Sequence, residues 1–223
     1  MISPASNGAL VADLLAAPYL IKVCAVTSVH DAELVADAGA SALGVILAAS
    51  PRRVSLETAS EVCRSVAGRL ARVGVFRDTR YVEVERAVDE LELDALQIHG
   101  GLPDGVASLA RDRGLVLIEA LSVGDLDAAE GSGDAYLVDG PRPGSGETHD
   151  WRVVASHAWD RPLIVAGGLT GETVASVLAS VPAWGCDVAS GSESSPGVKD
   201  RQRVETFVRN AREYFENKEE NRG

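Results

Sequence analysis

The stretch LIKVCAV at residues 20–26, followed by VHDAELVADAG at residues 29–39, shows the unit from which the chain is built. An apolar run rich in Val, Ile and Leu is typical of a strand buried on both faces. The second segment has helical periodicity and ends at Gly39, which is typical of a helix C-terminus. Cys24 stands where the strand leaves the core, so it is either a small hydrophobic residue or a reactive one.

Seven further apolar runs repeat this pattern, at residues 42–48, 71–76, 94–100, 115–121, 135–140, 162–168 and 186–191. Helical patterns separate most of them, one of which opens at Ser55, while residues 122–133 predict only a rudimentary helix. Strands that alternate with helices predict parallel pairing and right-handed crossovers. Eight units predict an α/β fold, a single (β/α)8 TIM barrel over residues 20–223. An open doubly wound sheet is the alternative, but no GxGxxG turn follows the first strand.

Residues 1–19 form a short N-terminal extension, which we expect to be either a short helix over the barrel base or a loose tail. The first basic residue is Lys22, which argues against a secretory signal. No apolar run approaches the roughly 18–20 residues that span a bilayer. We therefore expect a cytoplasmic protein with no membrane partner.

Net charge and cysteine content indicate which kinds of partner and which cellular compartment to expect. A net charge of −12 disfavours nucleic acid, although a local site can still bind a small anion. Cys24, Cys63 and Cys186 are odd in number and far apart, which indicates a reducing compartment and no disulfide scaffold. The last two are best interpreted as buried small hydrophobic residues. The sequence has no spacing typical of a metal site.

Chemistry in such a barrel lies where strands end. The seventh strand ends in VAGGLTGETV and the eighth in VASGSESSPGVKD, two turns of small residues on adjacent strands. Phosphate sites recur on these two loops because bare backbone and free N–H groups can approach an anion closely. The predicted phosphate-binding residues are Gly167, Gly168, Ser190, Gly191 and Ser192.

Polar or charged side chains stand at three other strand ends, and Lys22 stands within the first strand. Asp139 ends the sixth strand, and a turn-capping role is the alternative to a catalytic one. Arg52 and Arg53 follow the second strand, where one arginine can hold a carboxylate bidentately and the other is expected to be surface charge. His99 ends the fourth strand, where a purely structural role is the alternative. Lys22 needs a buried anionic partner if it points inward, and Asp187 is the candidate.

These strand ends, in this order, resemble phosphoribosylanthranilate isomerase, a small barrel enzyme of tryptophan biosynthesis. The family patterns KICGIT, SPRYVS and VQLHG are similar to KVCAVT, SPRRVS and LQIHG here. Three further family patterns have counterparts in this chain. The pattern LLDS…GGTGKTFDW is similar to LVDGPRPGSGETHDW, LAGGLTPENV is similar to VAGGLTGETV, and VDVSSGVE…PGVKD is similar to CDVASGSESSPGVKD. The resemblance runs from about residue 22 to residue 215.

The resemblance implies an Amadori rearrangement of N-(5-phosphoribosyl)anthranilate with no cofactor. It makes Cys24 the general base and Asp139 the general acid. If Asp139 is not the acid, His99 is the next candidate. Arg52 would hold the anthranilate carboxylate, and we assign His99 and Asp187 to substrate binding. We expect a monomer rather than a homodimer.

Four departures from the family pattern bear on this assignment, namely Ala25, Arg53, Pro143 and Glu147, where the family has glycine, an aromatic residue, glycine and lysine. They keep open a barrel that binds phosphosugars without turnover or acts on an altered substrate. A histidine-pathway isomerase is a further alternative. It is disfavoured because it needs aspartates on the first and fifth strands, and this chain offers Cys24 and the ending EALS there.

Overall fold

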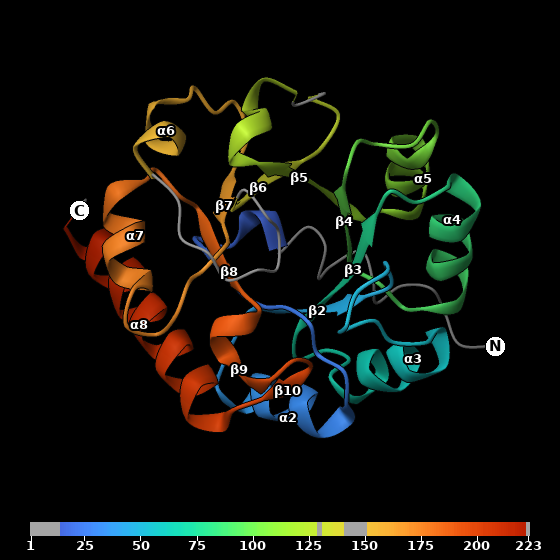
Figure 1. The fold of residues 1–223 in the computed structure, drawn as a ribbon, viewed down its shortest axis with the longest axis horizontal. Helices are drawn as coiled ribbons and strands as arrows, with labels where there is room; N and C mark the ends of the chain where they lie inside the picture. Colours follow the sequence, from blue (N-terminus) through green and yellow to red (C-terminus); the bar gives the residue numbers. More distant parts are fainter. Residues whose placement is uncertain (1–13, 129–130, 141–150, 222–223) are drawn as a thin grey trace.

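The computed structural model of the chain is a closed barrel of eight parallel strands ringed by helices (Figure 1), and it describes residues 14–128, 131–140 and 151–221. The strands follow chain order around the barrel, and β1 closes the ring by pairing with β8. This confirms the predicted (β/α)8 barrel and excludes the open sheet. The strands are β1 Leu20–Val23, β2 Ala42–Ile46, β3 Ala71–Arg77, β4 Ala95–His99, β5 Val116–Ser122, β6 Ala135–Asp139, β7 Leu163–Val165 and β8 Gly185–Val188.

Three of the seven described α-helices begin where a side chain caps the first turn. Side chains of Ser28, Ser55 and Asp200 accept hydrogen bonds from backbone N–H groups in the first turns of α2, α3 and α8. The rudimentary helix predicted after β5 is the 3₁₀ segment η1, Val123–Ala128. The α-helices are α2 Val29–Asp37, α3 Leu56–Ser65, α4 Tyr81–Glu90, α5 Val106–Arg113, α6 Trp151–Ser156, α7 Val174–Ser180 and α8 Arg201–Glu220. None of the helices in the described ranges is long and apolar enough to cross a membrane.

Side chains alternate between the two faces of each strand, so the core has an outer and an inner part. Outward residues pack between the barrel and its helices, and Cys63 and Cys186 are buried there as free thiols, as predicted. Inward residues fill the barrel, with small side chains such as Ala42, Ala71 and Ala95 near the strand starts. A polar inward residue at the opposite end of a strand therefore faces the mouth of the barrel.

The end of the N-terminal extension closes the base of the barrel. Residues 14–16 form a helical turn, and Leu14 joins the inner cluster with only 6% of its surface exposed. The indole N–H of Trp184, just before β8, donates to the carbonyl of Ala17 at 3.0 Å.

A short hairpin follows β8 on the way to α8. The 3₁₀ turn η2, Ser190–Ser192, leads into β9, Glu193–Ser195, which pairs antiparallel with β10, Val198–Lys199. The hydroxyl of Thr27, in the loop after β1, donates to the carbonyl of Gly197 at 2.5 Å. The hairpin is thus tied to the same end of the barrel as the mouth.

Candidate active site

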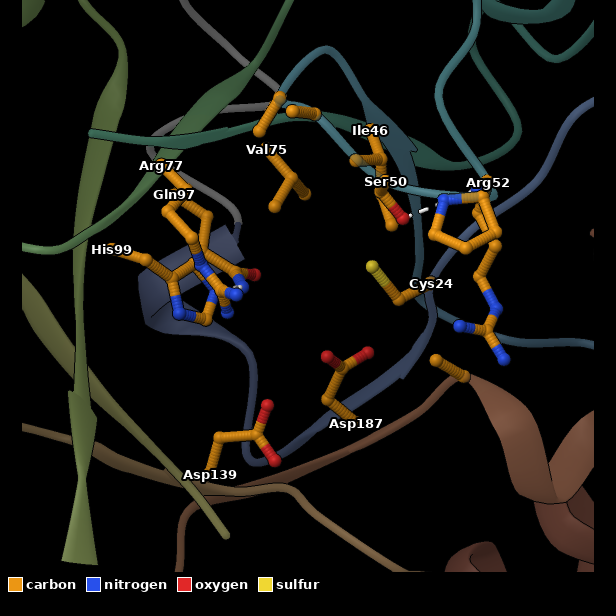
Figure 2. Close-up of a pocket in the computed structure, with 14 residues that line it drawn as sticks. Cys24, Ile46, Ser50, Arg52, Val75, Arg77, Gln97, His99, Asp139 and Asp187 are labelled. Atoms are coloured by element: carbon orange, nitrogen blue, oxygen red, sulfur yellow. Dashed lines mark hydrogen bonds between the residues drawn. The ribbon is translucent and has the colours of Figure 1, made fainter. Parts of the chain in front are cut away.

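A cavity of about 360 Å³ lies at the carboxyl ends of the strands (Figure 2). Its lining includes Cys24, Arg52, His99, Asp139 and Asp187, so the structure brings both predicted catalytic residues together with all three predicted substrate-binding residues. They come from β1, β2, β4, β6 and β8 or the loops after them. Parallel strands in a closed ring place all their carboxyl ends on one face, which explains this convergence.

Cys24 lies above a buried ion pair. Lys22, two residues earlier on the same inner face, is fully buried, and its Nζ lies 2.9 Å from Asp187 Oδ2, which confirms the predicted partnership. Burial by itself would lower the pKa of Lys22, but the Asp187 carboxylate and Cys24 raise it above its ordinary value. The lysine therefore stays charged beneath the thiol.

Opposing effects act on the pKa of the Cys24 thiol. Burial raises its pKa above the ordinary value, with a smaller contribution from Asp187, while the Lys22 and Lys199 ammonium groups act in the opposite direction. Lys199 Nζ also donates to the Cys24 carbonyl at 2.6 Å. The free protein thus holds Cys24 mainly as a thiol, and the two nearby lysines are placed where they would stabilise a thiolate.

The space around Cys24 depends on its neighbours in the chain and across the barrel. A Cβ at Gly44 of β2 would lie 2.8 Å from Cys24 Sγ and 3.2 Å from Lys22 Nζ, so only glycine fits without displacing the thiol. Ala25 has a φ of 63°, in the left-handed region that glycine adopts more readily. The departure at this position therefore costs about 1 kcal/mol of backbone strain next to Cys24.

Asp139 lies on a different wall of the cavity from Cys24 (Figure 2). Its Oδ1 accepts a hydrogen bond from the N–H of Gly140 at 2.7 Å. Gly167, at the end of β7, has a φ of 88° and packs so closely that a Cβ there would lie 2.7 Å from the same oxygen. The bare backbone of Gly167 therefore makes room for the Asp139 carboxylate.

The predicted phosphate loops touch each other at the rim. A Cβ at Gly191 would collide with the Leu169 carbonyl, so the turns after β7 and β8 meet only because the residue is glycine. Within the described chain, the backbone N–H groups of Gly168 and Gly191 donate to no protein acceptor. Ser192 is different, because it is fully buried and its N–H donates to the Ala189 carbonyl at 3.2 Å. Ser192 is one of the predicted phosphate-binding residues, but this bond occupies its backbone N–H.

His99 forms the wall opposite Cys24 and Arg52 (Figure 2). It is buried, and Gln97 Nε2 lies 2.8 Å from its Nε2. Burial, with help from the nearby charges of Arg77 and Lys22, lowers its pKa to about 3. The ring is therefore neutral at neutral pH and carries no proton that it could readily give up as an acid.

Sequence reasoning missed two residues of this wall. Arg77 and Gln97 line the same cavity, and Gln97 Oε1 is buried with no hydrogen-bond partner among the described residues. The signal was present in the alternation of the strands. Gln97 stands two residues before His99, and Arg77 stands two residues after inward-facing Val75.

The two adjacent arginines separate as expected. Arg52 lines the cavity and binds the Glu193 carboxylate, whereas Arg53 is exposed and borders a different hollow. Pro143 and Glu147, the other departures from the family pattern, lie outside the described residues.

Comparison with known proteins gives one consistent result. A sequence profile of the N-(5'phosphoribosyl)anthranilate (PRA) isomerase family matches residues 21–210. The N-(5'-phosphoribosyl)anthranilate isomerase of Pelobacter propionicus is 34% identical over 203 residues, covering 86% of this chain and 95% of the relative.

Solved structures give the same result. A phosphoribosyl anthranilate isomerase in complex with reduced 1-(o-carboxyphenylamino)-1-deoxyribulose 5-phosphate matches with a TM-score of 0.76 at 27% identity, covering 87% of this chain and 99% of that one. A structure of monomers generated from the dimeric isomerase of Thermotoga maritima matches with a TM-score of 0.74, the same identity and the same coverage.

Proposed function

The chain belongs to the N-(5'-phosphoribosyl)anthranilate isomerase family, and we propose that Cys24 and Asp139 are the base and the acid of its reaction. The reaction converts N-(5'-phosphoribosyl)anthranilate to 1-(2-carboxyphenylamino)-1-deoxyribulose 5-phosphate, a step of tryptophan biosynthesis. The observation that supports these roles is the placement of a thiol and a carboxyl group on different walls of one cavity at the barrel mouth.

The chemistry needs one proton donor and one proton acceptor. Asp139 protonates the ribose ring oxygen, the bond from that oxygen to C1 breaks, and a Schiff base forms. The Cys24 thiolate removes the proton from C2, which gives an enolamine. Ketonisation adds a proton to C1 and removes one from the C2 hydroxyl, so both side chains return to their starting states and no co-reactant is consumed.

The ends of the substrate match the polar groups of the cavity rim. Arg52 holds the anthranilate carboxylate, and the free N–H groups of Gly168 and Gly191 bind the phosphate, with Gly167 and Ser190 shaping the two turns. The neutral His99 ring and Asp187 Oδ1, which is buried without a hydrogen-bond partner in the described chain, suit hydroxyl groups of the sugar. The ligand in the related complex described above supports a phosphosugar in this site.

One assay separates this function from a barrel that binds phosphosugars without turnover. The purified protein should consume N-(5'-phosphoribosyl)anthranilate, followed by the loss of substrate fluorescence, and should rescue a tryptophan auxotroph that lacks its own isomerase. Tight binding of the reduced product without turnover would favour the binding-only alternative. For the anion site, a phosphate or sulfate bound away from Gly168 and Gly191 in a crystal would contradict the assignment.

The oligomeric state belongs to the same proposal. We propose a monomer, supported by exposed large apolar side chains that are few and scattered among the described residues, at Val29, Val82, Val153 and Val198. Light scattering should give the chain mass of 23.3 kDa. Twice that mass would indicate a dimer, as in the Thermotoga maritima relative.

A further inference from the structure

We propose that Glu193 is a positioning residue that presents Arg52 to the carboxylate of the substrate, an inference that rests on the proposed function. Glu193 is the first residue of β9 and is buried. Arg52 Nε donates to both of its carboxylate oxygens at 2.9 Å, and Arg52 Nη2 donates to Oε2 at 2.8 Å. One edge of the guanidinium is therefore occupied by this single carboxylate.

The other edge of the guanidinium stays available. No residue of the described chain accepts a hydrogen bond from Arg52 Nη1. A guanidinium carries N–H donors along more than one edge, so a carboxylate held on the Nε side leaves a second pair of donors on the Nη side. Because Arg52 lines the cavity, that second pair can meet an incoming carboxylate.

Other groups of the hairpin and of α8 hold Glu193 in place. The N–H of Gly197 donates to Glu193 Oε1 at 3.2 Å, and Lys199 Nζ lies 3.5 Å from the same oxygen. The guanidinium of Arg203 also donates to the backbone carbonyl of Glu193. A carboxylate held in this way cannot swing with the arginine, so the flexible Arg52 side chain is limited to one orientation before any ligand arrives.

The charges agree with this role. Glu193 contacts two cations, Arg52 and Lys199, so its single negative charge is shared between them and is not spent on Arg52 alone. A ligand carboxylate therefore meets net attraction at the outer edge of the guanidinium rather than repulsion from Glu193. The same Lys199 holds the Cys24 carbonyl, so one buried carboxylate contacts both the proposed anchor and the support of the proposed base.

The experiment compares two ligands by titration. One is the reduced product, and the other is its analogue with a phenyl ring in place of the 2-carboxyphenyl ring. Glu193→Gln should weaken binding of the reduced product by roughly 10- to 100-fold, which is the effect expected from losing a hydrogen bond to a charged group. Binding of the phenyl analogue should not change. In an Arg52→Met background the same substitution should have no further effect on either ligand. Glu205→Gln, which alters an exposed partner of Arg201 on α8, is the matched control.

Three outcomes overturn the proposal. The first is an equal loss of binding affinity for both ligands, and the second is no loss for either. The third is a loss for the reduced product alone that disappears in an Arg77→Met background but persists in an Arg52→Met background. If Glu193→Gln does not fold, Glu193→Asp keeps the charge but withdraws it from Arg52, and the same selective loss is expected. Failure of the proposed function is recognised separately, because the wild-type protein would then bind these ligands without turning over N-(5'-phosphoribosyl)anthranilate.

Discussion

Lys22 and Asp187 form an ion pair of 2.9 Å inside the barrel, one step below Cys24 on the strand face that leads to the cavity. Both side chains are buried, and Asp187 Oδ1 and Lys22 Nζ have no well-aligned hydrogen bond in the described chain. A buried charge pair that is not fully satisfied contributes little net stability, yet removal of one partner leaves the other charge stranded. The pair is therefore better explained by the role proposed for Cys24 than by a contribution to stability.

Lys22→Met should lower the free energy of unfolding by about 3–5 kcal/mol, because it leaves the Asp187 carboxylate uncompensated in the core. A second substitution, Asp187→Leu, should restore most of this stability without restoring turnover. Urea unfolding followed by circular dichroism measures both effects. The control is Arg69→Met, which removes an exposed pair with Asp37 and should cost less than about 1 kcal/mol. Equal costs for the buried and exposed pairs would contradict this account.

Cys24→Ser should reduce turnover by about 10²–10⁴ while the fold survives, because a hydroxyl is far too weak an acid to supply the base that a thiolate supplies. Steady-state kinetics with far-ultraviolet circular dichroism is the measurement. Cys63→Ala is the control, because Cys63 is buried in α3 and burial raises its pKa to about 12. Should the serine variant keep most of its activity, Cys24 is packing only.

Gly44→Ala should lower kcat by about 10²-fold, the cost of displacing a catalytic group by roughly 1 Å, because the new methyl group starts 2.8 Å from Cys24 Sγ. Binding of the reduced product should change much less, since the phosphate and carboxylate ends lie elsewhere. Gly124→Ala is the matched control, as its nearest neighbour would be 4.0 Å away. A loss confined to binding would instead mean that Gly44 shapes the substrate pocket.

The fold was predictable because its signal repeats. Each unit joins an apolar run to an amphipathic helix, so errors at single boundaries, such as the short β7, do not alter the count. Cys24, Asp139 and His99 could be placed at the cavity because each stands at the carboxyl end of a strand. Lys22 and Asp187 could be paired because a buried lysine requires an anion.

Contacts between distant loops could not be predicted in the same way. Glu193 and Lys199 stand in a motif that the sequence displays, but nothing local indicates that one binds Arg52 and the other the Cys24 carbonyl. These contacts depend on the fold of the hairpin after β8. The burial of Ser192 is a second example, because a turn of small residues indicates an anion site without saying which N–H groups point inward.

Leu14→Ala should lower the free energy of unfolding by about 2–5 kcal/mol, because the side chain fills the base of a barrel whose strand starts carry small residues. Turnover at temperatures below the transition should stay close to wild type, since the cavity lies at the other end. Val82→Ala, on an exposed side chain, is the control and should cost less than about 0.5 kcal/mol. An equally small effect at Leu14 would show that residues 14–19 do not seal the barrel.

The assignment of Asp139 as the acid and Cys24 as the base predicts how turnover depends on pH. In the proposed mechanism, the competent enzyme carries a protonated Asp139 and an ionised Cys24. Between the two pKa values, each unit of rising pH lowers the fraction of protonated Asp139 tenfold and raises the fraction of ionised Cys24 tenfold. The product of the two fractions is constant, so kcat/KM should be flat. Below that plateau the thiolate is lost, and above it the protonated carboxyl is lost. Because burial raises the pKa of Cys24 above its ordinary value, the alkaline decline should begin at a higher pH than the ionisation of a free thiol.

Asp139→Asn tests this assignment, because an amide cannot titrate in this range or give up a proton. Turnover should fall by about 10²–10⁴, and the remaining rate should follow the thiolate alone. It should therefore rise about tenfold per pH unit from neutral pH until Cys24 is ionised, over the range where the wild-type rate is flat, and then level off where the wild-type rate falls. The measurement is kcat/KM against pH for both proteins, with titration of the reduced product to show that binding persists. An alkaline decline that survives in Asp139→Asn would mean that another group supplies the proton. The neutral His99, with a pKa of about 3, would be a poor replacement, so the search would move to groups that titrate above neutral pH.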